Sequence, residues 1–469
     1  MERGSGFAVR DCVHARLAEC ADRFPDLPID VLDVQELDTF SPRDAALART
    51  ILRQTTVRWL TLRAILKHVL HKGFDEQPAP VKAGLLCGAC QIVLLDRIPS
   101  HAAINESVKW VGRISGQQSA GIVNAVLRKL ADLTGDVVAS VWNGERNAVP
   151  MMDGRVRQMN EPMLPSKQIE RWASATGLTR PCLELLETQF DLETARRIAM
   201  LTIAQPPTIV RLPCGTTRAG LVSSFQDSLR ERVDEHLVQH EDAHHCVFSG
   251  TKPDLEALLG QIPMVRVQDP ASSASLQLLT ETCGDSYHPN VIVDLCAGKG
   301  TKTLQLADMF PDAIIHATDI DARRFEDLVR MINERPVLAG RVRVHQYEAL
   351  VVAQQEHRSI RADMVLLDVP CSNSGVLARR PEARFRQTPD DHAKMIELQR
   401  LILKLGNSFR ADGGLIVYAT CSLIREENEG VVEACADNLG LTVRASRTVL
   451  PAGPEPIQWH DGSFAAILG

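Results

Sequence analysis

Two cysteines stand just past runs of apolar residues that predict β-strands. Cys371 follows the run MVLLD in the sequence DVPCSNSG, and Cys421 follows the run LIVYAT. Open α/β sheets place their active sites at the carboxyl ends of such strands. A thiol at that edge becomes a nucleophile when its surroundings favour the thiolate. A single cysteine is more often an inert core residue, but two at equivalent strand ends favour chemistry over packing.

A glycine turn follows a third apolar run, Val291 to Val293, in the sequence VIVDLCAGKGTKT. The pattern predicts a buried strand, a turn and then a helix beginning near Thr303. A phosphate-binding P-loop is excluded, because its G-x-x-x-x-G-K-[ST] template would place Cys296 and Thr301 at its two glycines. A dinucleotide turn, G-x-G-x-x-G, is weakened but not excluded, because Thr303 stands at its third glycine.

The remaining template, D-x-x-x-G-x-G, runs from Asp294 to Gly300. A turn without the third, phosphate-tight glycine suits a ligand that carries an adenosine but no pyrophosphate, which points to S-adenosylmethionine. An acidic residue at the end of the next strand should then hold the ribose hydroxyls. Asp319, in AIIHATDID, lies at the separation of about 20 residues that this role requires. The alternative is an ordinary turn that binds no ligand.

Four arginines gather in the sequence ARRPEARFR, residues 378–386, where Glu382 is the one acidic residue. Runs of charge are usually solvated loops, and that alternative stays open for this run. Because the run follows a strand-end cysteine, we favour contact with nucleic-acid phosphates, which depends on local positive charge. The arginines predicted to bind RNA are Arg379, Arg380, Arg384 and Arg386.

The composition limits the class of protein. A chain of 469 residues predicts about three domains. Its net charge of −7 repels nucleic acid at long range, so any RNA contact requires a local basic patch. The 12 cysteines are scattered, which favours reduced thiols over a disulfide framework. No apolar run is long enough for a signal peptide or a membrane span, so we expect a cytoplasmic protein without a membrane partner.

Three regions differ in the spacing of their apolar residues. Residues 1–150 carry the three-to-four spacing of helices, with breaks at Pro99 and Gly116. Residues 151–266 begin with a linker rich in proline and glycine and continue as a small α+β unit. In residues 267–469 strands alternate with helices, which predicts a doubly wound parallel sheet.

Other polar residues have structural interpretations. Ser166 is the predicted N-cap of the first helix after the linker. Cys87 and Cys90 form a C-x-x-C inside an apolar helix, without the second pair that zinc requires, so we interpret them as core residues. Five further side chains lie close in sequence but lack metal-ligand spacing, so no metal is predicted there. They are His236, His240, His244, His245 and Cys246.

Several motifs resemble known families. The run LLDRIPSHAAINESVKWV, followed by SAGIVNAVLRKL, resembles the RNA-binding NusB-like helical domain. The runs DLCAGKGTKT, LLDVPCSNSG and YATCSLIREEN resemble the motifs of the RNA cytosine-5 methyltransferases, and VQDPASSAS and WHDGSFAAIL resemble that family's lead-in and terminal segments. The resemblance covers nearly the whole chain. It implies an all-α NusB-like domain over 1–150, a small α+β domain over 151–266, and a Rossmann-like, S-adenosylmethionine-dependent methyltransferase domain over 267–469.

The resemblance also implies a reaction. Carbon 5 of cytosine is a poor nucleophile, so a thiolate first adds to carbon 6 and makes carbon 5 reactive towards the methyl group. Loss of the carbon 5 proton and elimination of the thiol then restore the ring. By resemblance Cys421 is the attacking nucleophile, Asp368 contacts N3 and the amino edge of the base, and Cys371 assists release. An acid role for Asp368 requires a raised pKa, which burial beside the base would supply.

A cofactor pocket is implied in the same way. Three of its residues depart from the family pattern: Lys299 replaces a proline, Thr301 replaces a glycine and Glu348 replaces an aspartate near the adenine. We expect these changes to alter affinity without abolishing activity. Lys302 matches the family lysine and is expected to orient Asp368 or the RNA base. The implied cofactor-binding residues are Cys296, Ala297, Gly298, Lys299, Gly300, Thr301, Lys302, Asp319, Glu348 and Asp368.

The resemblance implies that the substrate is a cytosine in small-subunit (16S) rRNA. We expect that RNA to be single-stranded or unfolded, because the base must leave any stack to reach a thiol in a pocket. The helical domain would extend the contact with RNA, and we expect a monomer. Three alternatives stay open. The substrate is another RNA, the protein is a DNA-type cytosine-5 methyltransferase with Cys371 as nucleophile, or it is a catalytically silent RNA-binding or ribosome-assembly factor.

Overall fold

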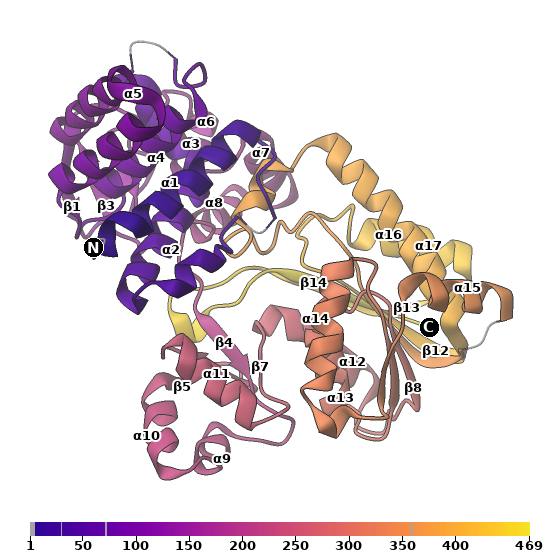
Figure 1. Ribbon diagram of the computed structural model, residues 1–469. Helices are drawn as coiled ribbons and strands as arrows, with labels where there is room; N and C mark the ends of the chain where they lie inside the picture. Colours follow the sequence, from indigo (N-terminus) through magenta and orange to yellow (C-terminus); the bar gives the residue numbers. More distant parts are fainter. Residues whose placement is uncertain (1–4, 30, 71–72, 358–359) are drawn as a thin grey trace. The chain divides into compact units, whose positions relative to one another are not determined.

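The computed structural model describes residues 5–29, 31–70, 73–357 and 360–469 (Figure 1). Contacts within the chain divide it into two compact units. The first is Met1–Gln205 with Leu377–Thr388, and the second is Pro206–Val376 with Pro389–Gly469. The predicted domain boundaries at 150 and 266 both fall inside a unit and stay predictions. Within the described ranges, no helix combines the length and the apolar character that crossing a bilayer requires.

The first unit is built around one helix that is buried on nearly all sides. This helix, α4, carries apolar or small residues around its whole circumference, and α1, α2, α3 and α5 pack against it. Gly84 and Gly88 allow α5 to approach closely, since a Cβ on Gly88 would lie 2.3 Å from Leu127 Cδ1. The five helices are α1 (Ser5–Arg23), α2 (Pro42–Val57), α3 (Trp59–Val69), α4 (Ala79–Val93) and α5 (Ser100–Leu133).

The predicted breaks in this region are confirmed, but its extent is not. Pro99 precedes α5, and Gly116 interrupts α5 with a φ of 81°. The helical region ends at Leu133, so the prediction of helix to about residue 150 is wrong for its last part. The next residues instead form a three-stranded antiparallel sheet with the order β1-β3-β2, whose members are β1 (Thr134–Val138), β2 (Ala148–Pro150) and β3 (Val156–Met159).

Three shorter helices complete the main part of the first unit: α6 (Gln168–Thr176), α7 (Arg180–Gln189) and α8 (Leu192–Leu201). The predicted N-cap of α6 is wrong. Lys167 occupies the cap position without a side-chain hydrogen bond, while Ser166 uses its carbonyl to accept from Arg171 Nη1 at 2.6 Å. This bond satisfies a carbonyl that precedes the helix and leaves the first N–H groups of α6 without a side-chain cap.

The second unit contains a small antiparallel sheet and a large mixed sheet. The small sheet has the order β5-β6-β4-β7 and packs with α9 (Arg218–Ser223), α10 (Asp227–His236) and α11 (Lys252–Gln261) around one apolar core. Its strands are β4 (Thr208–Arg211), β5 (Leu237–Gln239), β6 (His245–Phe248) and β7 (Arg266–Val267). An α+β arrangement, as predicted for this stretch, is confirmed.

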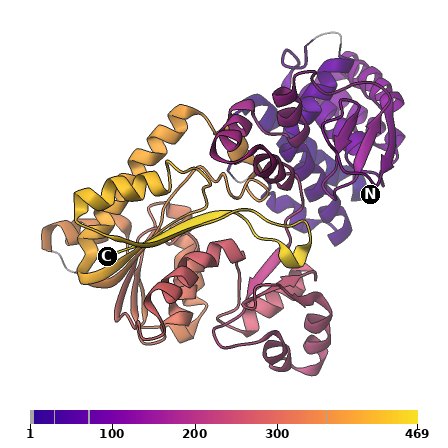
Figure 2. The same cartoon turned by 180° about the vertical axis from the view of Figure 1, so that it is seen from behind.

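The large sheet has seven strands in the order β10-β9-β8-β11-β12-β14-β13. The predicted alternation of parallel strands and helices is confirmed for β8 to β12, but β14 pairs antiparallel with both β12 and β13, so the sheet is mixed. Figure 2 shows this yellow final segment lying along the sheet. The strands are β8 (Val291–Asp294), β9 (Ile314–Ala317), β10 (Val342–Val344), β11 (Ala362–Asp368), β12 (Arg410–Thr420), β13 (Val443–Val449) and β14 (Ser463–Leu468).

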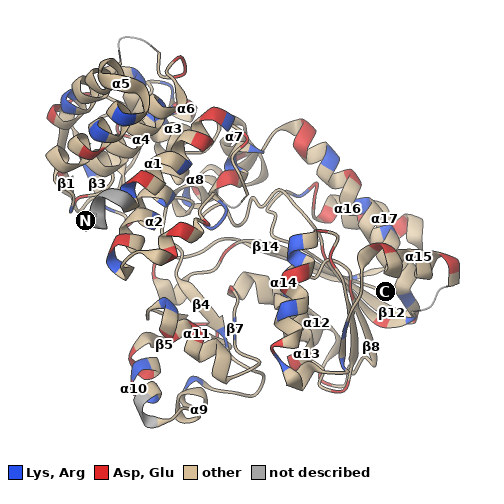
Figure 3. Ribbon diagram, in the orientation of Figure 1, with Lys and Arg blue, Asp and Glu red and all other residues tan. Residues whose placement is uncertain are grey.

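Helices cover both faces of the large sheet because alternate strand residues point to opposite faces. Ile292 belongs to the core shared with α12, α13 and α14, whereas its neighbour Val293 belongs to the core shared with α15, α16 and α17. Acidic and basic residues alternate along α14 and α16 (Figure 3). The helices are α12 (Pro270–Cys283), α13 (Thr301–Met309), α14 (Ala322–Asn333), α15 (Tyr347–His357), α16 (Pro389–Phe409) and α17 (Glu429–Leu439).

Candidate active site

The two strand-end cysteines meet. Strands β11 and β12 are parallel neighbours, with Asp368 paired to Ala419, so the segments that follow them leave the same edge of the sheet. The Sγ atoms of Cys371 and Cys421 lie 3.0 Å apart. Cys371 is buried, whereas Cys421 is partly exposed. Cys421 is therefore the thiol of this pair that a substrate reaches more easily.

The electrostatics of the pair are asymmetric. The pKa of the Cys371 thiol is raised well above its usual range, first by its contact with Cys421, then by burial and by the nearby carboxylate of Glu427. Two thiolates at this separation would repel strongly, so the pair carries at most one negative charge. The Cys421 thiol donates to Asn373 Oδ1 at 3.3 Å, and Asn373 Nδ2 donates to the carbonyl of Cys371 at 3.0 Å.

Asn373 lies outside the predicted site. Its backbone is left-handed, with φ 59°, a conformation that asparagine tolerates better than most residues. The turn lets its amide contact both cysteine segments. An asparagine between two serines is a weak signal of such a turn in the sequence, because those residues also fill ordinary loops.

Asp368, at the end of β11, forms an ion pair across the sheet edge. Lys302, in the first turn of α13, places its Nζ 2.8 Å from Asp368 Oδ2 and 3.3 Å from Ser272 Oγ. Lys302 is mostly buried, while the Asp368 side chain is about one-third exposed, at 35%. The lysine is thus in contact with the carboxylate that it was expected to orient, and the carboxylate faces outward at the same edge as the cysteines.

The glycine turn after β8 has two different glycines. Gly300 has a φ of 89°, which favours glycine, and a Cβ there would displace the ends of the Met331 and Leu328 side chains on α14. Gly298, with φ 58°, has no described heavy atom within 4 Å of the Cβ position. The backbone at Gly298 is therefore open to close approach by a ligand, as a nucleoside-binding turn requires.

Two carboxylates flank this turn. Asp319, just past β9, accepts the N–H of Gly298 at 2.8 Å and that of Asp321 at 2.9 Å, which fixes its orientation. Asp294 is fully buried, and burial raises its pKa to about 7 even though Thr303 Oγ1 donates to its Oδ2 at 2.7 Å. Asp294 Oδ1 has no hydrogen-bond partner among the described residues. Three features suit a bound nucleoside cofactor: the open backbone at Gly298, the fixed carboxylate of Asp319 and the unpaired buried oxygen of Asp294.

The remaining predicted cofactor residues differ in placement. Lys299 is mostly exposed and pairs with Asp327 Oδ2 at 3.0 Å, so its side chain points towards α14. Thr301 begins α13. Burial raises the pKa of Cys296 well above its usual range. Glu348 is exposed in the first turn of α15. Asp294 was not among the predicted binding residues, although an acid at the strand end before the turn is itself a signal.

The arginine run departs most from prediction. Residues 377–388 pack within the first unit, although the chain on both sides of them belongs to the second. The Arg384 side chain is fully buried, so the predicted phosphate contact is wrong for this residue. Phosphate contact stays a prediction for Arg380, which is exposed, and for the half-buried Arg379 and Arg386. Arg384 instead donates to the backbone carbonyls of Val57, Thr176, Gly177, Thr202, Leu377 and Pro381.

The histidines near residue 240 have structural partners. His245 is buried between Asp242, 3.1 Å away, and Ser273, 3.3 Å away, and His240 Nε2 lies 2.9 Å from the carbonyl of Trp459. In the part of the chain that the structure describes, no three His, Cys, Asp or Glu side chains are grouped as metal ligands. A nearby cavity of about 610 Å³ includes none of the predicted catalytic residues.

A doubly wound sheet with a glycine turn and an acid after the next strand is the arrangement of a Rossmann-like, nucleoside-binding fold. Residues 285–443 match the family described as 16S rRNA methyltransferase RsmB/F, and residues 22–132 match the NusB family. The resemblances to a Rossmann-like methyltransferase and to a NusB-like domain, seen in the sequence, are confirmed. S-adenosylmethionine is the cofactor of the methyltransferase family.

Two relatives have the same name, apart from the word "probable" in one of them. "Ribosomal RNA small subunit methyltransferase B" of Vibrio cholerae is 27% identical over 439 residues, covering 91% of this chain and 90% of the relative. "Probable ribosomal RNA small subunit methyltransferase B" of Bacillus subtilis is 25% identical, covering 82% and 79%. The solved "Crystal Structure of PH0851" shares the fold, with a TM-score of 0.69, 17% identity and coverage of 100% and 99%.

Proposed function

We propose that this protein is an S-adenosylmethionine-dependent RNA (cytosine-5)-methyltransferase that acts on small-subunit (16S) rRNA. The observation that carries the proposal is the meeting of Cys371 and Cys421, with Sγ atoms 3.0 Å apart, at the sheet edge that also bears Asp368. Two thiols and a carboxylate at one strand-end edge suit covalent activation of a pyrimidine. The names of the relatives support rRNA as the substrate.

Cys421 is the proposed nucleophile, because it is the more exposed of the two thiols. Its sulfur bonds to carbon 6 of cytosine, and the electrons of the carbon 5–carbon 6 double bond move through the ring towards N3. Carbon 5 then has enamine character. When bound, S-adenosylmethionine supplies an electrophilic methyl group. The turn at Gly298, Asp319 and Asp294 would hold this cofactor.

Asp368 is proposed to contact N3 and the amino edge of the base, and so to stabilise the proton that N3 takes up from water as the adduct forms. Lys302 fixes one carboxylate oxygen at 2.8 Å, so the other oxygen is presented in a defined direction. Water then accepts the proton on carbon 5, the electrons of that bond re-form the carbon 5–carbon 6 double bond, the Cys421 sulfur leaves carbon 6, and N3 gives up its proton. Cys371, in hydrogen-bonding distance of that sulfur, stabilises it as it leaves and so assists release.

Recognition of the RNA is proposed to involve both units. The base must be unstacked to reach the thiols, which favours single-stranded or unfolded rRNA. The NusB-family segment and Arg380 are the proposed sources of further contacts. With a net charge of −7, binding should depend on these local contacts and weaken steeply with salt.

The test is adduct trapping with an RNA that contains 5-fluorocytosine, whose fluorine blocks the loss of the group on carbon 5. Cys421→Ala should form no covalent adduct. Cys371→Ala should form the adduct with 5-fluorocytosine, and with ordinary cytosine in the RNA it should accumulate the adduct where the wild type releases it. Denaturing gels with labelled RNA report both outcomes. If Cys371→Ala alone abolished the adduct, the roles of the two cysteines would be those of the DNA-type enzymes, and the proposed assignment would be wrong.

A further inference from the structure

The two segments that carry the cysteines are joined by a buried polar network. The hydroxyl oxygens of Ser372, Ser374 and Ser422 lie 3.1 to 3.2 Å from one another, and all three side chains are buried. Ser372 follows Cys371 and Ser422 follows Cys421. The network therefore fixes the backbone beside each thiol relative to the other.

Glu427 holds one side of this network. Its side chain is fully buried, and its Oε2 accepts the N–H of Ser372 at 2.9 Å and Gln399 Nε2 at 3.1 Å. The same nitrogen of Gln399 lies 2.9 Å from the carbonyl oxygen of Pro370. The peptide groups on both sides of Cys371 are thus tied to one carboxylate and one amide.

The carboxylate of Glu427 is not fully paired. Its Oε1 is buried and has no hydrogen-bond partner in the described part of the chain. In a medium of low polarity, such a charge acts strongly on nearby titrating groups. The pKa of Cys371 is raised by contact with Cys421, by burial and by this carboxylate. Two other titratable groups lie nearby: Tyr418, whose O–H donates to the Glu427 carbonyl at 2.7 Å, and Asp368, three residues before Cys371.

We propose that Glu427 is a positioning residue that makes the two thiols of the pair unequal by keeping the proton on Cys371. The pair of thiols carries at most one negative charge. Glu427 makes a negative charge unfavourable at Cys371, because its carboxylate accepts the N–H of the next residue, Ser372. The meaning of this asymmetry for catalysis rests on the proposed function, but the asymmetry itself is measurable without RNA.

The experiment follows the alkylation of each cysteine by iodoacetamide as a function of pH, in the full-length reduced protein, with peptide mass spectrometry to separate the sites. In the wild type, Cys371 should react only well above neutral pH. Glu427→Gln keeps the shape of the side chain and removes its charge, so it should lower the Cys371 midpoint by about one pH unit. Glu426→Gln, the same change at the exposed neighbouring residue, is the matched control and should leave both midpoints unchanged.

Glu427→Asp separates charge from geometry, because it keeps the charge and shortens the side chain. Because the shorter side chain no longer reaches the N–H of Ser372 but keeps its charge nearby, it should lower the Cys371 midpoint by less than Glu427→Gln does. The proposal is overturned if the Cys371 midpoint is the same in Glu427→Gln and Glu426→Gln, or if Glu427→Asp lowers it as far as Glu427→Gln. If Glu427→Gln does not fold, a Cys371 midpoint in Glu427→Asp equal to the wild-type value overturns the proposal. Failure of the wild type to form the 5-fluorocytosine adduct would count against the proposed function and not against this assignment.

Discussion

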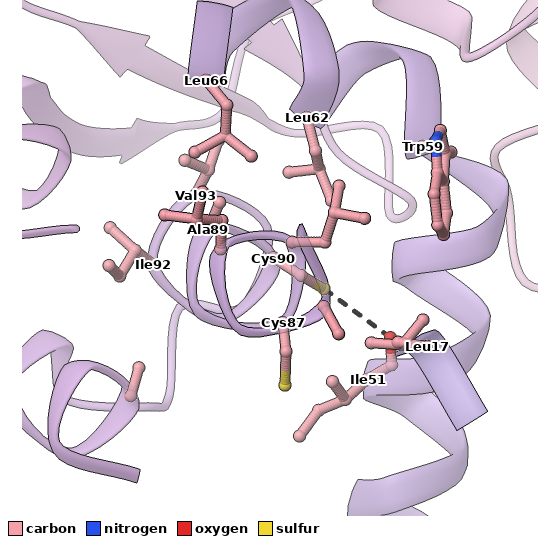
Figure 4. Close-up of a cluster of buried hydrophobic side chains, with 14 of the residues drawn as sticks. Leu17, Ile51, Trp59, Leu62, Leu66, Cys87, Ala89, Cys90, Ile92 and Val93 are labelled. Atoms are coloured by element: carbon pink, nitrogen blue, oxygen red, sulfur yellow. Dashed lines mark hydrogen bonds between the residues drawn. The ribbon is translucent and has the colours of Figure 1, made fainter. Parts of the chain in front are cut away.

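The two units bury polar side chains for different purposes. In the first unit, the fully buried Arg384 donates to six backbone carbonyls. Figure 4 shows Cys87 and Cys90 on α4 among apolar side chains, and the Cys90 thiol donates to the carbonyl of Ile51. Burial raises the pKa of Cys90 to about 12, so this thiol stays protonated at neutral pH.

In the second unit, the buried polar groups at the edge of the large sheet include two carboxylates. Asp294 and Glu427 each leave one buried carboxylate oxygen without a partner in the described residues. The partner of the Cys371 thiol is a second thiol, that of Cys421, with the two Sγ atoms 3.0 Å apart. Buried polar groups are normally paired, so unpaired ones require a cause. Residue type and burial alone therefore do not distinguish a structural cysteine from a reactive one. The groups that contact the thiol distinguish them.

The largest expected effect contrasts a thiol from each unit. Cys421→Ala should reduce methyl transfer by a factor on the order of 10⁴, because the covalent step is lost. Cys90→Ala should leave the rate of methyl transfer unchanged within about twofold, since it removes only core packing. Incorporation of labelled methyl groups into rRNA measures both. Comparable losses in the two variants would break the distinction between structural and reactive thiols.

The next effect concerns the pH dependence of folding. The pKa of Asp294 is raised in the folded protein to about 7, so the folded state binds this proton more tightly than the unfolded chain. The stability that this group contributes is present below about pH 4 and is lost as the pH rises through about 7, with a difference of up to about 4 kcal/mol.

Asp294→Asn should remove that dependence. Urea unfolding of the ligand-free protein should therefore show the wild type losing stability relative to Asp294→Asn between these two pH values. If the free energies of unfolding of the two proteins changed in parallel with pH, burial would not raise the pKa of Asp294.

A smaller effect compares one buried cation from each unit. Arg384→Met should lower the free energy of unfolding by about 3 kcal/mol, because several buried carbonyls lose their donor. Lys302→Met should change stability by less than about 1 kcal/mol, because its partner Asp368 is partly exposed. It should instead slow methyl transfer by about 10²-fold. A larger loss of stability in Lys302→Met than in Arg384→Met would reverse the comparison.

The smallest expected effect separates the two glycines of the turn. Gly298→Ala should weaken S-adenosylmethionine binding by about tenfold and destabilise the fold by about 1 kcal/mol, the cost of an alanine at positive φ. Gly300→Ala should destabilise the fold further, because its Cβ would collide with Met331. Calorimetric titration and thermal unfolding measure the two quantities. Unchanged affinity in Gly298→Ala would place the ligand elsewhere.

Much of the fold follows from local patterns. The apolar runs ending at Asp294 and Asp368 are strands, and the glycine turn lies where the spacing places it. The antiparallel return of β14 was not predicted, since an apolar run does not reveal the direction of its partner. The burial of Arg384 was missed for a similar reason: a charge run looks solvated until the segments that supply its acceptors are known.

By itself, the sequence determined the chemistry available to this protein: two thiols, a carboxylate and a glycine turn, each at the end of a predicted strand. Strand period and turn composition are properties of neighbouring residues, so they can be seen without the fold. The tertiary structure decided which of these groups meet, that Glu427 supports Cys371 and that Arg384 binds carbonyls instead of phosphate. Those outcomes depend on residues distant in the chain, whose approach is set by packing and by the pairing of buried polar groups.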